Sequence, residues 1–337
     1  MKLQRSNIDK IIFDMDGVVT SEYTYWDAAA LTVYELLYSN EYYGKREIDR
    51  EWCIKNLRRI SNTIFCHGKT VEAVKKLGVN TNWDLAYLVF CISQYLDPQM
   101  DSFEDWHFES VCMFIENITI KPPELYVAVE GLVASTLPGE VGCYKRTVGK
   151  LWNELLESFQ LWYHGSDEIP GIKINEEPIV PLDDIKKTLG ELQDAGFKLA
   201  IGTGRPRDEI IFPLEKWGLL SYFDEDSIAT YDDVCDAEKI LPDAGQLAKP
   251  HPFIFRKAAF GDKYEDRDIA NDEFGKILAK RCLVVGDAPS DLMAAKAGGF
   301  PFAAVLTGIE GEKARGYFEE NQAELILGSV IDLKIEE

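Results

Sequence analysis

Residues 11–17 read Ile-Ile-Phe-Asp-Met-Asp-Gly, an apolar run that ends in two carboxylates and a glycine. In an extended strand, side chains two positions apart point the same way, so we expect Asp14 and Asp16 to face one site. Two carboxylates this close repel each other, and at neutral pH either one is protonated or a cation lies between them. The stretch therefore predicts a strand of an open parallel sheet with metal-assisted chemistry at its carboxyl end.

Short apolar segments alternate with helical ones from Pro181 onward, which predicts the rest of this sheet. The first helical segment carries apolar residues on one face between Leu182 and Leu192, and the second begins at Pro206. The segments that we predict as strands are 198–201, 228–230, 282–285, 302–305 and 325–327. Such alternation is typical of a doubly wound parallel α/β sheet with right-handed crossovers. The strand at residues 10–14 has no partners nearby in the sequence, so we expect it to join this later sheet.

The segment between the first strand and the alternating region has apolar residues at helical spacing and no clear strand, which predicts an inserted all-α domain. Asn82 is the expected cap of one helix, and residues 122–123, both proline, are expected to start another. Val148 opens the apolar face of a third. The predicted boundaries are 1–20 and 177–337 for the α/β core and 21–176 for the helical domain.

The composition is typical of a soluble globular protein, with 46% apolar and 28% charged residues among 337. Acidic residues outnumber basic ones by 58 to 36, and the net charge of −22 repels a nucleic-acid backbone and an anionic membrane surface, so we expect neither as a partner. The seven cysteines are never spaced as Cys-x-x-Cys, which predicts neither a disulfide framework nor a zinc site. Since there is also no apolar run of signal-peptide or membrane-spanning type, we expect a cytoplasmic protein.

A second polar signal follows the predicted strand 198–201. Thr203 and Gly204 offer a hydroxyl and a flexible backbone amide just before a helix begins, which is an environment that suits a phosphate oxygen. Threonine and glycine are also ordinary turn residues, and this alternative stays open. We expect the neighbouring Arg205 to cap the turn or to form a surface ion pair.

Two further stretches of the sequence contain acidic side chains and a lysine. Asp287 and Asp291 follow the strand at 282–285, and Asp287 would reach a metal held by Asp14, although both acids are also typical of the first turn of a helix. Lys249 stands in a proline-flanked loop. A single lysine is usually a solvated surface charge, but a site with four acids and a phosphate requires a cation.

The order and context of these four pieces resemble the haloacid dehalogenase-like superfamily of aspartate-nucleophile phosphohydrolases and phosphotransferases. The resemblance covers the α/β part, about residues 8–20 and 178–330, and implies a Rossmann-like core. The matching motifs, from first to fourth, lie at residues 14–19, 203–205, 249–250 and 286–291.

The resemblance implies a role for each of these residues. Asp14 would attack phosphorus to form an aspartyl-phosphate, while Asp16 would act as general acid and then as general base. Mg²⁺ would be held by the Asp14 carboxylate, the Asp16 backbone carbonyl and Asp287, with Asp291 nearby. The residues expected to balance the charge on the transferring phosphoryl group are Thr203, Gly204 and Lys249.

The function implied is a Mg²⁺-dependent phosphatase for a small phosphorylated metabolite. The inserted helical domain resembles a cap that selects the substrate and excludes water, although it is longer than the compact four-helix type. A sugar phosphomutase is the alternative enzyme, because the same residues can return the phosphoryl group to a sugar hydroxyl. A non-catalytic binding protein on this fold is disfavoured, since none of the expected nucleophile, acid, lysine or metal ligands is missing.

Overall fold

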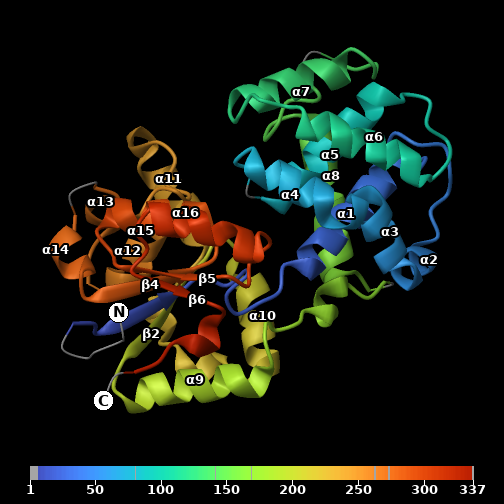
Figure 1. Cartoon of the computed structure of the whole chain (residues 1–337). Helices are drawn as coiled ribbons and strands as arrows, with labels where there is room; N and C mark the ends of the chain where they lie inside the picture. The colour runs from blue at the N-terminus through green and yellow to red at the C-terminus, as the bar shows by residue number, and fades with distance from the viewer. Residues whose placement is uncertain are drawn as a thin grey trace. The chain divides into compact units, whose positions relative to one another are not determined.

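The structure is a computed structural model that describes residues 7–79, 81–140, 142–167, 169–261, 263–271 and 274–335. It divides into two compact units, one formed by Met1–Ser21 with Glu177–Glu337 and the other by Glu22–Glu176 (Figure 1). The first is an α/β unit and the second contains helices, with no strand beyond isolated bridges in its described part.

The α/β unit contains a six-stranded parallel sheet with the strand order β3-β2-β1-β4-β5-β6. The first strand of the chain therefore lies in the interior of the sheet, with Ile11 opposite both Leu199 and Leu283. This arrangement confirms the predicted doubly wound α/β fold. The strands are β1 (Lys10–Phe13), β2 (Lys198–Gly202), β3 (Ile228–Ala229), β4 (Cys282–Gly286), β5 (Phe302–Val305) and β6 (Leu325–Leu327).

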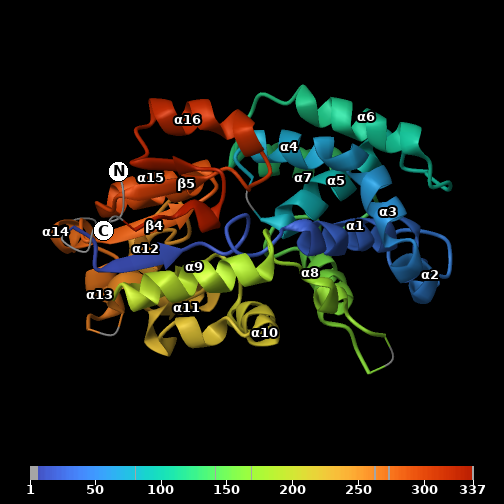
Figure 2. The same ribbon diagram turned by 60° about the horizontal axis from the view of Figure 1, so that its bottom comes forward.

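Alternate residues of the sheet enter two separate cores. Ile11 and Phe13 pack with α9 (Leu182–Asp194) and α10 (Arg207–Trp217) on one face, whereas Ile12 packs on the other. The second face is covered by α11 (Tyr231–Ile240), α12 (Phe253–Phe260), α15 (Pro289–Gly298) and α16 (Arg315–Glu320), and Figure 2 shows α9 in front of the sheet. Two short helices, α13 (Asp266–Ile269) and α14 (Lys276–Ala279), complete the unit. A strand buried on both faces explains why residues 11–13 are continuously apolar.

The helical unit is built around α5 (Asn82–Leu96), in which every residue from Asp84 to Gln94 is buried. A helix that is apolar on all sides is stable only when other helices surround it. The other helices of the unit are α1 (Tyr23–Tyr38), α2 (Arg50–Lys55), α3 (Leu57–Ile64), α4 (Lys69–Lys76), α6 (Asp105–Glu116), α7 (Glu124–Ala134) and α8 (Lys150–His164). No helix in the described part of the chain is long and apolar enough to cross a membrane.

Two predicted details of these helices are wrong, and one is confirmed. Thr81, not Asn82, caps α5, because its hydroxyl accepts the backbone N–H of Asp84 at 3.0 Å. Val148 is 67% exposed and precedes α8, so it does not contribute to the apolar face of that helix. Helix α7 does begin directly after Pro123, as expected.

Buried carboxylates hold the helical unit together. Glu35 on α1 is fully buried and accepts hydrogen bonds from the Arg50 guanidinium at 2.8 and 3.1 Å. Its other oxygen accepts from Ser158 Oγ at 2.6 Å and Trp162 Nε1 at 3.0 Å, both on α8. Glu35 thus has a charged partner and two neutral donors, which offset the cost of its burial.

Asp84 on α5 has a comparable set of partners. It forms a two-bond ion pair with Arg146 and also accepts from Tyr126 Oη on α7 at 3.1 Å. The Arg146 guanidinium in turn lies 4.2 Å from the centroid of the Tyr126 ring, a cation–π contact. The acid therefore links α5 to α7 and to the segment before α8.

Candidate active site

The site residues predicted from the sequence lie where neighbouring parallel strands end. Asp14 follows β1, Thr203 follows β2 and Asp287 follows β4, and these three strands are adjacent in the sheet. Crossovers bring the carboxyl ends of parallel strands to one edge, which is where such sheets bind ligands. One carboxylate oxygen from each of Asp14, Asp287 and Asp291 lies within 4.8 Å of the others.

Lys249 contacts two of these acids directly. Its Nζ lies 2.9 Å from Asp14 Oδ1 and 2.8 Å from Asp291 Oδ1, and 4.8 Å from the centroid of the Phe255 ring. Burial favours the neutral amine, but the two carboxylates outweigh it and raise the pKa of Lys249. The lysine side chain is 13% exposed and paired with two acids, so it is not a solvated surface cation.

Asp14 is 7% exposed at the end of the sheet's interior strand β1. Burial raises the pKa of Asp14 to about 7; Lys249 opposes this shift, and the charges of Asp291 and Asp16 add to it. The positive charge of Lys249 thus does not fully offset the effects of burial and of the neighbouring acids on the pKa of Asp14. Carboxylate oxygens in such a group are the ligands that Mg²⁺ prefers, so these residues fit a divalent cation.

Two glycines make room for Asp287. Gly17 has a φ of 70°, and a Cβ built on it would lie 2.4 Å from Asp287 Oδ2. A Cβ on Gly308 would lie 1.9 Å from the same oxygen. Thr307 Oγ1 donates to the Gly17 carbonyl at 2.5 Å, which ties the loop after β5 to the first motif. The sequence reasoning missed Thr307 and Gly308, for which the only signal is a Thr-Gly pair just after the strand at 302–305.

Asp291 caps a helix and also lies in the group of close carboxylates. Its Oδ2 accepts the backbone N–H of Ala288 at 3.2 Å, at the start of α15. Its Oδ1 binds Lys249 and belongs to the acid group. A helix-capping interaction therefore fixes the orientation of this buried acid.

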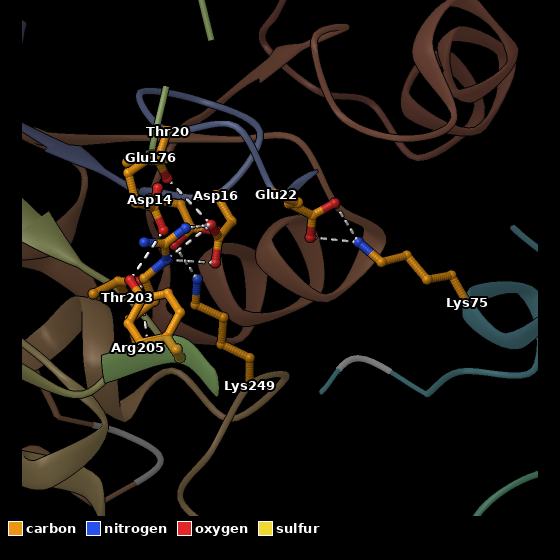
Figure 3. A network of polar contacts seen from close by, with 10 residues as sticks. Asp14, Asp16, Thr20, Glu22, Lys75, Glu176, Thr203, Arg205 and Lys249 are labelled. Atoms are coloured by element: carbon orange, nitrogen blue, oxygen red, sulfur yellow. Dashed lines mark hydrogen bonds and ion pairs between the residues drawn. The ribbon is translucent and has the colours of Figure 1, made fainter. Parts of the chain in front are cut away.

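Asp16 is turned toward Arg205 (Figure 3). Arg205 is only 3% exposed, and its Nε donates to Asp16 Oδ1 at 2.9 Å and to Oδ2 at 3.0 Å. The expectation of a surface role for Arg205 is wrong, because its guanidinium lies inside the unit and pairs with an acid of the first motif. The sequence offered no signal for this pair, since the partners are 189 positions apart.

Thr203 and Gly204 differ in their surroundings. Thr203 is buried, its N–H donates to the Ala229 carbonyl at 3.1 Å, and its hydroxyl accepts the Arg205 N–H at 3.2 Å. Gly204 is exposed, and a Cβ built on it would have no described atom within 4 Å. The turn therefore has a fixed threonine, and open space where a Cβ of residue 204 would lie.

Glu209 on α10 is a buried acid that the sequence reasoning missed. It is 2% exposed, and burial, together with the charges of Asp16 and Asp232, raises its pKa to about 8. Its signal in the sequence is weak, because acids are common in the first turn of a helix.

Comparisons with known proteins bear on the family of the chain. The family profile of haloacid dehalogenase-like hydrolases matches residues 114–299. Pyrophosphatase PpaX from Bacillus pumilus is 31% identical over 136 residues, which are 40% of this chain and 51% of that protein. The chain thus matches about half the length of this curated relative.

Solved structures were also matched to the chain. An X-ray structure of a Northeast Structural Genomics Consortium target is 30% identical, covers 97% of each chain and has a TM-score of 0.78. A putative β-phosphoglucomutase from Thermotoga maritima covers 97% of this chain and 96% of its own, with 16% identity and a TM-score of 0.45.

Proposed function

The chain belongs to the haloacid dehalogenase-like hydrolase family, and from this premise we propose that it is a Mg²⁺-dependent phosphohydrolase acting on a small phosphorylated metabolite. One observation carries the proposal. Asp14, at the end of an interior strand of the sheet, contacts Lys249 at 2.9 Å and shares a group of close carboxylates with Asp287 and Asp291. A buried acid with one cation and two further acids is an arrangement suited to phosphoryl transfer, in which positioning and charge supply most of the catalysis.

Asp14 is the nucleophile in this proposal. Its carboxylate oxygen forms a bond to phosphorus while the bond from phosphorus to the leaving oxygen breaks, and Asp16 gives that oxygen a proton. Asp16 then takes a proton from the water that hydrolyses the aspartyl-phosphate. Lys249 orients Asp14 through Oδ1 and offsets charge on the phosphoryl oxygens.

The acids of the site would hold the metal. Asp14, Asp287 and the Asp16 backbone carbonyl are the proposed ligands, with Asp291 close by. When bound, Mg²⁺ supplies positive charge that allows an anionic nucleophile to approach an anionic phosphate. Thr203 and the amide of the exposed Gly204 would receive the remaining phosphoryl oxygens.

The helical unit is proposed to be the cap that selects the substrate. The eight α-helices that the structure describes between Tyr23 and His164 are inserted between the first and second motifs, which is the place of the cap in the family that the sequence resembles.

A panel of phosphorylated metabolites, assayed for free phosphate with and without Mg²⁺, tests the proposal. We expect Asp14→Asn to lower kcat by about 10⁴-fold or more while circular dichroism and Tm stay close to wild type. Asp9→Asn is the matched control, because Asp9 lies at the other end of the same strand and pairs with Arg281. Hydrolysis retained in Asp14→Asn would overturn the mechanism, and an isomerised sugar phosphate in place of free phosphate would identify a mutase.

A further inference from the structure

The acid proposed to carry the proton is held by a buried cation. Arg205 binds both oxygens of Asp16, with Nε at 2.9 Å from Oδ1 and 3.0 Å from Oδ2, and its Nη2 also donates to Oδ1. Thr20 Oγ1 donates to Oδ1 at 3.1 Å. Figure 3 shows Arg205 and Thr20 meeting the Asp16 side chain.

The two oxygens of Asp16 are not equivalent. Oδ1 accepts from Arg205 Nε, Arg205 Nη2 and Thr20, whereas Oδ2 accepts only from Arg205 Nε within the described residues. The Asp16 side chain is 25% exposed, although Arg205 and Thr20 are almost completely buried. Within the described residues Oδ2 thus has fewer donors than Oδ1, which leaves it more capacity to bond to a substrate.

Arg205 is itself fixed by the turn that carries it. Its N–H donates to Thr203 Oγ1 at 3.2 Å, and its carbonyl accepts the N–H of Tyr231 at 2.9 Å. A guanidinium is planar and always charged, so two parallel bonds from it define the plane of a carboxylate in a way that a lysine does not. The turn after β2 therefore sets the orientation of an acid that follows β1.

We propose that Arg205 is a positioning residue for Asp16, which with Thr20 holds Oδ1 so that Oδ2 exchanges the proton with the leaving oxygen and with water. This inference rests on the proposed function of Asp16 as acid and base. In the first step the Oδ2–H bond breaks as the leaving oxygen takes the proton. In the second step Oδ2 takes a proton from the water whose oxygen bonds to phosphorus.

The choice of substrate separates this role from a purely structural one. An alkyl phosphate has a poor leaving group that requires a proton, whereas para-nitrophenolate leaves without one. A misplaced Asp16 therefore slows phosphoryl transfer to Asp14 much more from an alkyl phosphate than from para-nitrophenyl phosphate. This step is measured by kcat/KM, whereas hydrolysis of the aspartyl-phosphate is common to both substrates and affects kcat. A fold defect would slow both to a similar degree.

The test measures kcat and KM on an alkyl phosphate and on para-nitrophenyl phosphate for wild type, Arg205→Lys, Arg205→Ala and Thr20→Val. We expect both Arg205 variants to lose about 10²-fold or more in kcat/KM on the alkyl phosphate, which is the usual worth of general acid–base catalysis. On para-nitrophenyl phosphate we expect kcat/KM to fall by less than about tenfold. Added guanidinium chloride should restore part of the activity of Arg205→Ala and none of that of Asp16→Asn.

Thr20→Val keeps the Arg205–Asp16 pair. This variant tests the inference even if truncation of the buried arginine unfolds the chain. We expect it to show the same preference for the better leaving group, to a smaller degree. Equal losses on both substrates without rescue, or an unchanged leaving-group dependence in Thr20→Val and Arg205→Lys, would overturn the inference. If wild type hydrolyses neither substrate, the proposed function itself fails, which is a different result.

Discussion

Glu35 in the helical unit is a buried carboxylate with its own arginine and two neutral donors, whereas two buried carboxylates at the sheet edge of the α/β unit share one lysine. Asp14 and Asp291 both pair with Lys249, and Asp287 lies in the same group of carboxylates. Structural acids are usually neutralised by the fold itself, since an unpaired buried charge is costly. A surplus of acid at one place is typical of a site that binds a cation, so the contrast distinguishes structural from functional carboxylates.

Beyond the loss expected for Asp14→Asn, the largest effect should follow from disturbing the proposed metal site without replacing a proposed ligand. Gly308→Ala places a Cβ 1.9 Å from Asp287 Oδ2, so Asp287 must move. We expect kcat on a phosphate ester to fall by about 10³-fold, as it should when EDTA removes divalent cations from wild type. The rise in Tm on adding Mg²⁺ to wild type should disappear in the variant.

Gly316→Ala is the matched control, because a Cβ there has no described atom within 4 Å. It should keep both the activity and the Mg²⁺ response. A Gly308→Ala variant that binds Mg²⁺ as wild type does would contradict the assignment of Asp287.

The second prediction concerns stability and separates the two kinds of acid. Glu35→Gln leaves Arg50 without its buried counter-charge, and we expect it to lower the free energy of unfolding by about 3 kcal/mol. Asp14→Asn removes one of several crowded acids, so in Mg²⁺-free buffer it should leave that free energy unchanged or raise it. Urea titrations of both variants at neutral pH measure their free energies of unfolding. Equal destabilisation by the two substitutions would contradict the distinction between structural and functional carboxylates.

Glu209 is expected to make the free energy of unfolding depend on pH, which provides a further test. Its pKa is raised from 4.5 to about 8, chiefly by burial, so the folded state favours the protonated acid more than the unfolded state does. This contribution to stability is complete below pH 4.5 and is lost as the pH rises to about 8. We expect wild type to lose about 2 kcal/mol more than Glu209→Gln across that window. Parallel stability curves for the two proteins would show that Glu209 ionises normally.

The smallest expected effect is on stability, and it differs between Thr81 and Asn82, two adjacent residues of the helical unit. Thr81→Ala removes the cap of α5 and should lower the free energy of unfolding by about 1 kcal/mol. Asn82→Ala, one position later, should have almost no effect. Thermal unfolding of the pair measures this, and a larger loss in Asn82→Ala would argue against the observed cap.

The strands and the residues that follow them were predictable because each depends on local pattern. Apolar runs identified β1, β2 and β4, and parallel topology then placed Asp14, Thr203 and Asp287 at one edge. Contacts between distant parts of the chain were not predictable in this way. The burial of Arg205 depends on a partner in the first motif, and the fit of Gly308 depends on the Asp287 carboxylate, so neither is encoded in neighbouring residues. The prediction of Asn82 as the cap of α5 was wrong for another reason, since Thr81 and Asn82 are both residue types that cap helices well.

The interior position of β1 also affects how the protein folds during synthesis. Lys10 pairs with Lys198 on one side and Cys282 on the other, so the first strand emerges from the ribosome long before either neighbour exists. The helical unit needs only residues made in the meantime and can fold first. Until β2 and β4 emerge, the apolar residues 11–13 have no sheet to join, and this exposed segment is where a nascent chain would most need a chaperone.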